Sequence, residues 1–224
     1  RCFTMDSLFD YDNGQTVSYA PLADRMRPER LEDILGQEGA VGKNSFLYRM
    51  IEKDTIPSIL LFGPPGCGKT TIASVIAKMT HSHFVKLKAN EDLSYNRSTT
   101  IVFIDQLHRF NKAQQDLLLP YVEDGTIILI GATTENPYFE INRPLLSRVR
   151  LIHLNALPEK AEIEILRRAL TDKVKGLGNY GYRASDDVLS MISSYASGDI
   201  RMALNLLEQA ASLLPMKGTL TVKE

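Results

Sequence analysis

The sequence predicts an α/β protein in which a parallel five-stranded sheet is covered by helices and followed by a small all-helical segment. Apolar runs alternate with helical stretches over roughly the first two thirds of the chain, as in sheets built from parallel strands. From about residue 157 the pattern changes to helices alone. With 224 residues, of which 44% are hydrophobic and 24% charged, the chain is long enough to bury a substantial core.

Each element is predicted from its local pattern. Short apolar runs indicate strands at 58–62, 83–89, 99–105, 125–132 and 149–154. Helical or turn-like stretches follow at 38–53, 69–80, 111–122, 143–147, 158–173, 185–196 and 199–214. Pro57 introduces the first strand, Ser185 is a helix cap, and Pro215 ends the last helix. We expect a flexible segment at 1–19, an α/β core at 20–156 and a helical lid domain at 157–224.

Composition limits the class of protein. The net charge of −1 gives no overall nucleic-acid signature, so DNA contact would need a local basic patch or several subunits. Cys2 and Cys67 are the only cysteines, which argues against a disulfide framework or a cysteine metal site. No apolar run is long enough to span a bilayer, and no secretory signal is visible at the start. We expect a cytoplasmic protein, nucleoid-associated in a bacterium, or a nuclear protein in a eukaryote.

Residues 63–70 carry the first chemical signal, a complete phosphate-binding loop of the form G-x-x-x-x-G-K-[ST] between a strand and a helix. Its glycines let backbone N–H groups converge on phosphate oxygens. Lys69 would meet the β- and γ-phosphates, Thr70 would offer a hydroxyl to Mg²⁺, and the helix N-terminus adds its positive dipole end. The predicted nucleotide contacts here are Gly63, Pro64, Pro65, Gly66, Cys67, Gly68, Lys69, Thr70 and Thr71. A glycine-rich turn with a chance lysine is rejected, because strand, loop and helix occur in the required order.

The second signal is the apolar run 99–104, which ends in Asp105 and Gln106. An aspartate at this strand end can hold Mg²⁺ opposite the phosphate loop, while its structural alternative is a strand-end cap. Many ATPases of this layout carry a glutamate next, which polarises the attacking water. The Gln106 amide can orient water but cannot accept its proton, so it favours ATP binding over turnover.

Five segments together resemble the RarA/MgsA family of AAA+ ATPases. They are residues 21–28, Gly36-Gln37, the phosphate loop, residues 104–116 and residues 131–137. The family includes the eukaryotic Werner-helicase-interacting ATPases and is similar to clamp loaders and the Holliday-junction motor RuvB. His-Arg-Phe-Asn-Lys at 108–112 and Ala-Thr-Thr-Glu-Asn-Pro at 132–137 are far more specific than a phosphate loop alone. The resemblance runs from about residue 20 to the end.

The resemblance implies roles for further residues. Thr134, alone or with Thr133, is similar to the sensor-1 residue that reads the γ-phosphate. Ser147-Arg148 resembles the clamp-loader pair whose arginine reaches a neighbouring subunit's ATP. Arg201 matches sensor 2, which would couple lid position to the γ-phosphate. The segments matching the family's adenine side contribute Arg27, Pro28, Ile34 and Leu35. From sequence alone, each arginine has the alternative role of a solvated charge or salt-bridge partner.

His108 and Arg109 remain open between two interpretations. They would lie at a subunit or DNA-facing surface, or they would cap a helix or pack against the core.

The function implied by the resemblance is a DNA-dependent ATPase in replication-fork maintenance, DNA repair and recombination. It would hydrolyse MgATP at the subunit interfaces of a homo-oligomer. The implied partners are forked or single-stranded DNA and single-strand-binding protein or polymerase components, with no membrane. Residues 89–99 are shorter than the family's usual region, which weakens the expectation of DNA contact. We also expect the family's C-terminal assembly region to be absent, because the chain stops at Glu224.

Two other functions stay open. A nucleotide-gated scaffold would bind ATP on DNA or replication proteins and hydrolyse little, because Gln106 replaces the catalytic glutamate. A P-loop kinase for a small molecule is a more distant alternative. Thr134, Ser147-Arg148 and the helical lid argue against it.

Overall fold

The computed structural model describes residues 20–80, 83–87 and 100–222. The expected flexible segment at 1–19 and the shortened stretch at 89–99 lie outside these residues. The main sheet has the strands β1 (Ile59–Phe62), β2 (His83–Leu87), β3 (Thr100–Ile104), β4 (Ile127–Thr133) and β5 (Arg150–His153). Their order is β2-β3-β4-β1-β5, and all paired strands are parallel. The predicted α/β class and parallel five-stranded sheet are confirmed.

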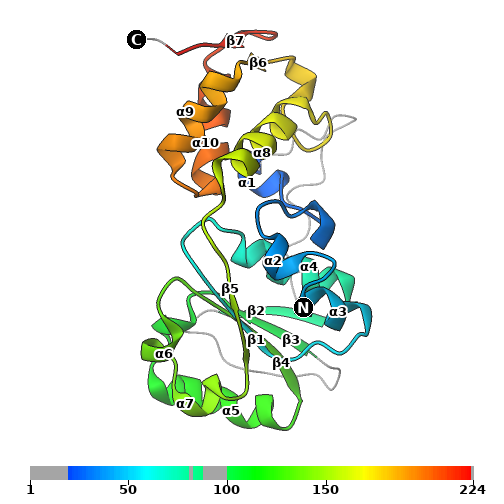
Figure 1. Ribbon diagram of the computed structural model, residues 1–224, viewed down its shortest axis with the longest axis vertical. Coiled ribbons are helices and arrows are strands. Elements are labelled where there is room, and N and C mark those ends of the chain that lie inside the picture. The colour runs from blue at the N-terminus through cyan, green and yellow to red at the C-terminus, as the bar shows by residue number, and fades with distance from the viewer. Residues whose placement is uncertain (1–19, 81–82, 88–99, 223–224) are drawn as a thin grey trace, which may run out of the picture.

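Helices cover both faces of this sheet (Figure 1). On one face lie α2 (Glu38–Val41), α3 (Phe46–Glu52) and α4 (Lys69–Met79), and on the other lie α5 (Lys112–Glu123), α6 (Pro137–Glu140) and α7 (Arg143–Leu146). Ile101 and Phe103 of β3 pack into the first layer, whereas Val102 and Ile104 pack into the second. Because both faces are covered, the strand is apolar throughout rather than alternating, which is the pattern that marks it in the sequence.

The parallel arrangement brings three strand ends to one edge of the sheet. Phe62 at the end of β1 pairs with Thr133 at the end of β4, and Ile104 at the end of β3 pairs with Gly131. The phosphate loop, Asp105 and Thr134 therefore all leave the sheet at its carboxyl edge. Ligands of open parallel sheets bind outside this edge.

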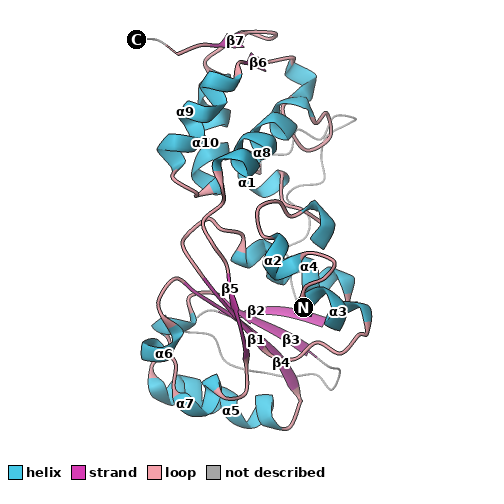
Figure 2. Ribbon diagram, viewed as in Figure 1, coloured by secondary structure: helices cyan, strands magenta, loops and turns pink. Residues whose placement is uncertain are grey.

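The C-terminal helices form a second apolar cluster (Figure 2). These helices are α8 (Glu159–Thr171), α9 (Asp186–Ala196) and α10 (Ile200–Ser212), close to their predicted bounds. The short α1 (Leu22–Arg25) also belongs here, since Leu22 is buried in this cluster and its backbone N–H donates to Glu208 at 3.0 Å. The first helix of the described residues thus packs with the C-terminal helices and not with the sheet.

Several small elements differ from the predictions. The C-terminal part is not exclusively helical, because β6 (Arg183–Ala184) and β7 (Thr219–Leu220) form a parallel two-stranded sheet. Two-residue strands are too short to show a period-two pattern. The helix predicted at 38–53 is divided into α2 and α3, and Ser45 caps the second piece by accepting the Tyr48 N–H at 3.1 Å. The other unpredicted elements are α1, α6 and the 3₁₀ turns Leu31–Asp33, Leu107–Arg109 and Gly178–Tyr180.

No helix within the described residues is long and apolar enough to cross a membrane.

Glu162 of α8 is a buried acid inside the C-terminal helices, with 1% of its surface exposed. Burial raises the pKa of this carboxyl, and the nearby charge of Asp199 adds to the rise, while a hydrogen bond from Ser193 lowers it. The folded pKa therefore lies above that of the unfolded chain. Glu162 contributes to folding stability through its protonated form. This contribution is fully present below the unfolded pKa and is lost as pH rises through the folded pKa.

Glu162→Gln is expected to remove this pH dependence, because the amide stays neutral at every pH. Relative to that of the natural protein, the free energy of unfolding of Glu162→Gln should increase as pH rises from below about 4.5 toward neutrality. Urea unfolding at a series of pH values measures it, with the exposed Glu159→Gln as the control. Parallel stability curves for Glu162→Gln and the natural protein would contradict the assignment.

Candidate nucleotide-binding site

A cavity of about 370 Å³ lies between the carboxyl edge of the sheet and the C-terminal helices. Its walls come from four parts of the chain: the segment 23–35, the phosphate loop, the ends of β3 and β4, and helices α8 and α10. A largely apolar hollow with a few polar groups at a strand-end edge is the usual form of a small-molecule site.

The phosphate loop wraps around the base of this cavity. Gly66 and Gly68 have φ values of +71° and +101°, in the left-handed region that favours glycine. α4 starts directly after Gly68, so its free N–H groups and dipole favour an anion there. The buried Lys69 ammonium donates to the carbonyl oxygens of Gly63 at 2.7 Å and Pro64 at 2.6 Å. A bound phosphate would find this charge already positioned.

Cys67 within the loop is buried, and Gln37 supports the loop from outside. Burial raises the pKa of the Cys67 thiol, against an opposing effect of Lys69, so this thiol stays neutral. The buried Gln37 side chain donates to the carbonyl oxygens of Asn155 at 2.7 Å and Cys67 at 3.2 Å. Gln37 thus ties the phosphate loop to the chain leaving β5, a role that the sequence did not indicate.

Thr70 and Asp105 both line the cavity, and their oxygen atoms are the ligands that Mg²⁺ prefers. Within the described part of the chain, no group of three or more His, Cys, Asp or Glu side chains could hold a metal ion by itself. This small donor set fits a magnesium ion that arrives with nucleotide phosphates, since Mg²⁺ commonly uses one or two protein ligands together with phosphate and water.

The end of β4 presents two threonines to the cavity, and they differ in exposure. Thr134 is exposed, whereas the Thr133 hydroxyl is buried, accepts the Glu135 N–H at 3.0 Å and lies 2.9 Å from Nδ1 of His108. With its ring proton on Nε2, His108 would accept the Thr133 proton. His108 therefore has an internal partner, in agreement with the packing interpretation.

The C-terminal helices contribute two arginines. Arg201 lines the cavity from the first turn of α10, where Asp199 caps the helix by accepting the N–H groups of Arg201 at 3.0 Å and Met202 at 3.3 Å. Arg168 lines it from α8, and its Nε donates to Glu164 at 3.1 Å. Arg168 was not predicted. The one sequence feature that could have indicated Arg168 is its position three residues after Ile165, which also lines the cavity.

Comparison with known proteins identifies the domain that contains this site. The family model "ATPase family associated with various cellular activities (AAA)" matches residues 59–156, which include the phosphate loop and Asp105. Replication-associated recombination protein A of Coxiella burnetii is 43% identical over 202 residues. Residues 59–156 are an AAA ATPase domain.

Other relatives of this AAA ATPase chain have consistent names. The Escherichia coli K12 replication-associated recombination protein A is 41% identical over 210 residues, covering 88% of this chain and 47% of that protein. The Coxiella match covers 85% of this chain and 46% of its relative. ATPase WRNIP1 of Dictyostelium discoideum is 38% identical, with 88% of this chain and 24% of that protein covered. The chain thus spans about half the length of its bacterial relatives.

A solved structure gives the same result for the fold. The Thermotoga maritima RuvB Holliday junction branch migration motor matches with a TM-score of 0.72 and 28% identity, covering 85% of this chain and 66% of that one. The predicted resemblance to the RarA group and to RuvB is confirmed, and the fold is one that binds nucleotide.

Most of the predicted site residues of the AAA ATPase chain come together. Those lining the cavity are Arg27, Pro28, Ile34, Leu35, Pro65, Gly66, Cys67, Gly68, Lys69, Thr70, Thr71, Asp105, Gln106, Thr134 and Arg201. Gly63 and Pro64 instead hold the Lys69 ammonium. Thr133, named with Thr134 in the prediction, also lines the cavity. The unpredicted lining residues are mostly apolar: Ala23, Met26, Asp33, Leu157, Ile165, Arg168, Ile200 and Leu204.

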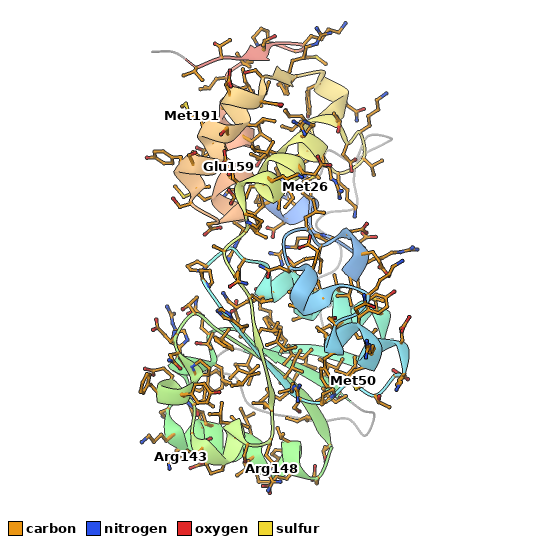
Figure 3. All side chains as sticks on the ribbon, viewed as in Figure 1. Met26, Met50, Arg143, Arg148, Glu159 and Met191 are labelled. Carbon is orange, nitrogen blue, oxygen red and sulfur yellow. The ribbon has the colours of Figure 1, made fainter. Side chains whose placement is uncertain are left out.

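Arg148 lies far from this cavity, at the end of the molecule opposite the C-terminal helices (Figure 3). Its guanidinium pairs with Glu123 of α5, with 2.9 Å between Nη2 and Oε1. Both side chains are exposed, so the pair adds little stability and can rearrange. Within one chain Arg148 takes no part in the cavity. Its predicted role requires a neighbouring subunit.

Gly66→Ala is expected to destabilise the folded chain more than the same change at another left-handed glycine. A Cβ at Gly66 would lie 2.0 Å from Oδ1 and 2.5 Å from Cα of Asp199, which is backbone that cannot move aside. Gly125 is the matched control: its φ is +75°, and among the described residues nothing lies within 4 Å of the position that an added methyl group would take. Both changes cost left-handed strain, and the overlap adds about 1–3 kcal/mol at Gly66 alone. Denaturant unfolding measures the difference, and equal losses would show that the overlap is relieved.

Proposed function

We propose that this chain is the ATP-hydrolysing part of a DNA-dependent AAA ATPase that acts in replication-fork maintenance, DNA repair and recombination. The observation that carries the proposal is the convergence of Lys69, Asp105 and Arg201 on one cavity. The names of the relatives, replication-associated recombination protein A and ATPase WRNIP1, supply the biological setting. They favour an active ATPase over the nucleotide-gated scaffold.

We propose two domains, an α/β core over residues 20–156 and a lid over residues 157–224, with nucleotide bound between them. The separate apolar clusters of the sheet and of the C-terminal helices support this division. α1 would move with the lid, since Leu22 is buried in the lid cluster. Nucleotide that contacts both sides would then couple its own state to lid position.

The proposed reaction is attack of water on the γ-phosphorus, with cleavage of its bond to the oxygen that bridges to the β-phosphate. ADP and inorganic phosphate are the products. Lys69 would neutralise charge on the β- and γ-phosphate oxygens, and Gln106 would orient the water, whose proton must pass to phosphate or solvent. Thr70 and Asp105 would hold Mg²⁺, which contributes charge neutralisation when bound. Arg201 would read the γ-phosphate from the lid.

The active form would be a homo-oligomer in which Arg148 of one subunit completes the site of the next. Forked or single-stranded DNA, with single-strand-binding protein or polymerase components, are the proposed partners. The compartment would be the cytoplasm of a bacterium, at the nucleoid, or the nucleus of a eukaryote. Because the net charge is −1, DNA contact would depend on local basic surfaces of the assembled subunits.

Phosphate release from MgATP, with and without forked DNA and over a range of protein concentrations, tests this proposal. We expect DNA to stimulate hydrolysis and the specific activity to rise as subunits associate. Arg148→Ala should lose hydrolysis but keep ATP binding, whereas Arg143→Ala, an exposed arginine of the nearby α7, should keep both. Bound ATP without turnover, in the natural chain and in Gln106→Glu, would contradict the proposal and support the scaffold.

A further inference from the structure

Two glutamate–serine hydrogen bonds join α8 and α9, one helical turn apart. The Ser190 hydroxyl donates to Glu159, and the Ser193 hydroxyl donates to Glu162. The pairs share their chemistry and their helices but differ in burial. Glu159 is exposed, whereas Glu162 and Ser193 are 1% and 2% exposed. A buried carboxyl costs free energy unless its surroundings use it, so Glu162 requires an explanation that Glu159 does not.

Glu162 is joined to the end of α9, directly before the turn that leads into α10. Ser193, whose hydroxyl donates to this carboxyl, lies in the last turn of α9, and its backbone carbonyl accepts the Ser197 N–H at 2.9 Å. Oε1 of Glu162 is buried and has no hydrogen-bond partner in the part of the chain that the structure describes. Gly198 is left-handed, with φ of +90°, and a Cβ there would lie 2.8 Å from that of Ala156, on the connection from sheet to lid. The turn is therefore held from the lid side through the Glu162–Ser193 pair at the end of α9, and from the other side by Ala156.

The same turn touches the phosphate loop. Asp199 packs so closely on Gly66 that no side chain fits between them, since a Cβ added to Gly66 would lie only 2.5 Å from the Asp199 Cα. Asp199 also caps α10, and Arg201, two residues further on, lines the nucleotide cavity. A displacement of the turn would thus move the lid arginine relative to the phosphate loop. Glu162 itself is not among the described residues that line the cavity.

We infer that Glu162 is a positioning residue: through Ser193 its carboxyl fixes the end of α9, which holds the following Gly198–Asp199 turn against the phosphate loop and thereby places Arg201 for the nucleotide. This rests on the proposed ATPase function. The inference adds to the proposed site a residue of the lid interior, which acts through Arg201 without touching ATP. Its raised pKa agrees with a carboxyl that serves as a hydrogen-bonding group more than as a charge.

Equilibrium titration with MgATP tests the inference in the full chain. Glu162→Ala should weaken ATP binding by about tenfold, while Glu162→Gln, which keeps the hydrogen-bonding shape, should stay within about twofold of the natural chain. Glu159→Ala is the matched control and should bind ATP normally. If Glu162→Ala does not fold, Ser193→Ala replaces it, with Ser190→Ala as its control and about threefold weaker binding expected.

A double-mutant cycle with Arg201→Ala separates positioning from general structural support. If Glu162 acts through Arg201, Glu162→Ala should have little further effect on ATP affinity in the Arg201→Ala background. An undiminished tenfold effect in that background would overturn the inference. Equal ATP affinities of Glu162→Ala and Glu159→Ala, with normal binding by the natural chain, would also overturn it. Failure of the natural chain to bind ATP would instead overturn the proposed function, and this inference with it.

Discussion

Gln106→Glu is expected to raise the rate of ATP hydrolysis by about 10²–10⁴-fold, the usual contribution of a general base. Gln106 follows the proposed Mg²⁺ ligand Asp105 and lines the same cavity. Its amide can position water, but only a carboxylate can also take the proton that the attacking water loses. The change keeps side-chain length and leaves the loop and lid untouched, so ATP affinity should change little.

Steady-state phosphate release at saturating MgATP measures this effect, with ATP titration alongside. Gln106→Asn is the control, because it keeps an amide and suits the left-handed backbone at this position, where φ is 56° and ψ is 51°. It should give no gain. A Gln106→Glu variant that binds ATP and remains as slow as the natural chain would show that the missing base does not limit hydrolysis.

Lys69→Ala is expected to weaken ATP binding by roughly 30-fold to several thousand-fold, the equivalent of about 2–5 kcal/mol for a buried, hydrogen-bonded charge pair. Lys69 is 8% exposed and is held at the phosphate loop by the Gly63 and Pro64 carbonyl oxygens. Its removal leaves the phosphates without this cation.

Titration with MgATP measures the loss, and thermal unfolding without nucleotide checks that the variant folds. Lys78→Ala, an exposed lysine on the same helix, is the control and should bind ATP like the natural chain. Equal affinity of Lys69→Ala and Lys78→Ala would mean that the phosphates do not bind at this loop.

The sequence predicted the parts of the fold that have local causes. The run Ile101–Ile104 is apolar at every position because β3 is covered on both faces, so it could be recognised without the structure. The phosphate loop and Asp105 could be placed together because strands of a parallel sheet end at one edge. Ser185 and the nearby prolines gave the bounds of α8, α9 and α10 to within about two residues, although the Ser185 side chain makes no capping hydrogen bond.

The remaining features depend on how the helices pack, which no local pattern records. The apolar wall that Leu204 and Ile165 give to the cavity exists because α8 and α10 lie over the phosphate loop. Leu22 could not be assigned to the C-terminal cluster, since nearly the whole core separates it from those helices in the sequence. In the sequence, Glu162 resembles an ordinary surface acid of an amphipathic helix, and only the fold shows that it is buried.

The measurement that tests the central claim most directly is a crystal structure of this chain with Mg²⁺ and a non-hydrolysable ATP analogue. We expect the base between Ile34, Leu35 and the lid, the phosphates on the loop with Lys69, and Arg201 directed at the γ-phosphate. Nucleotide bound elsewhere, or bound at the loop with Arg201 and the lid turned away from it, would contradict the account.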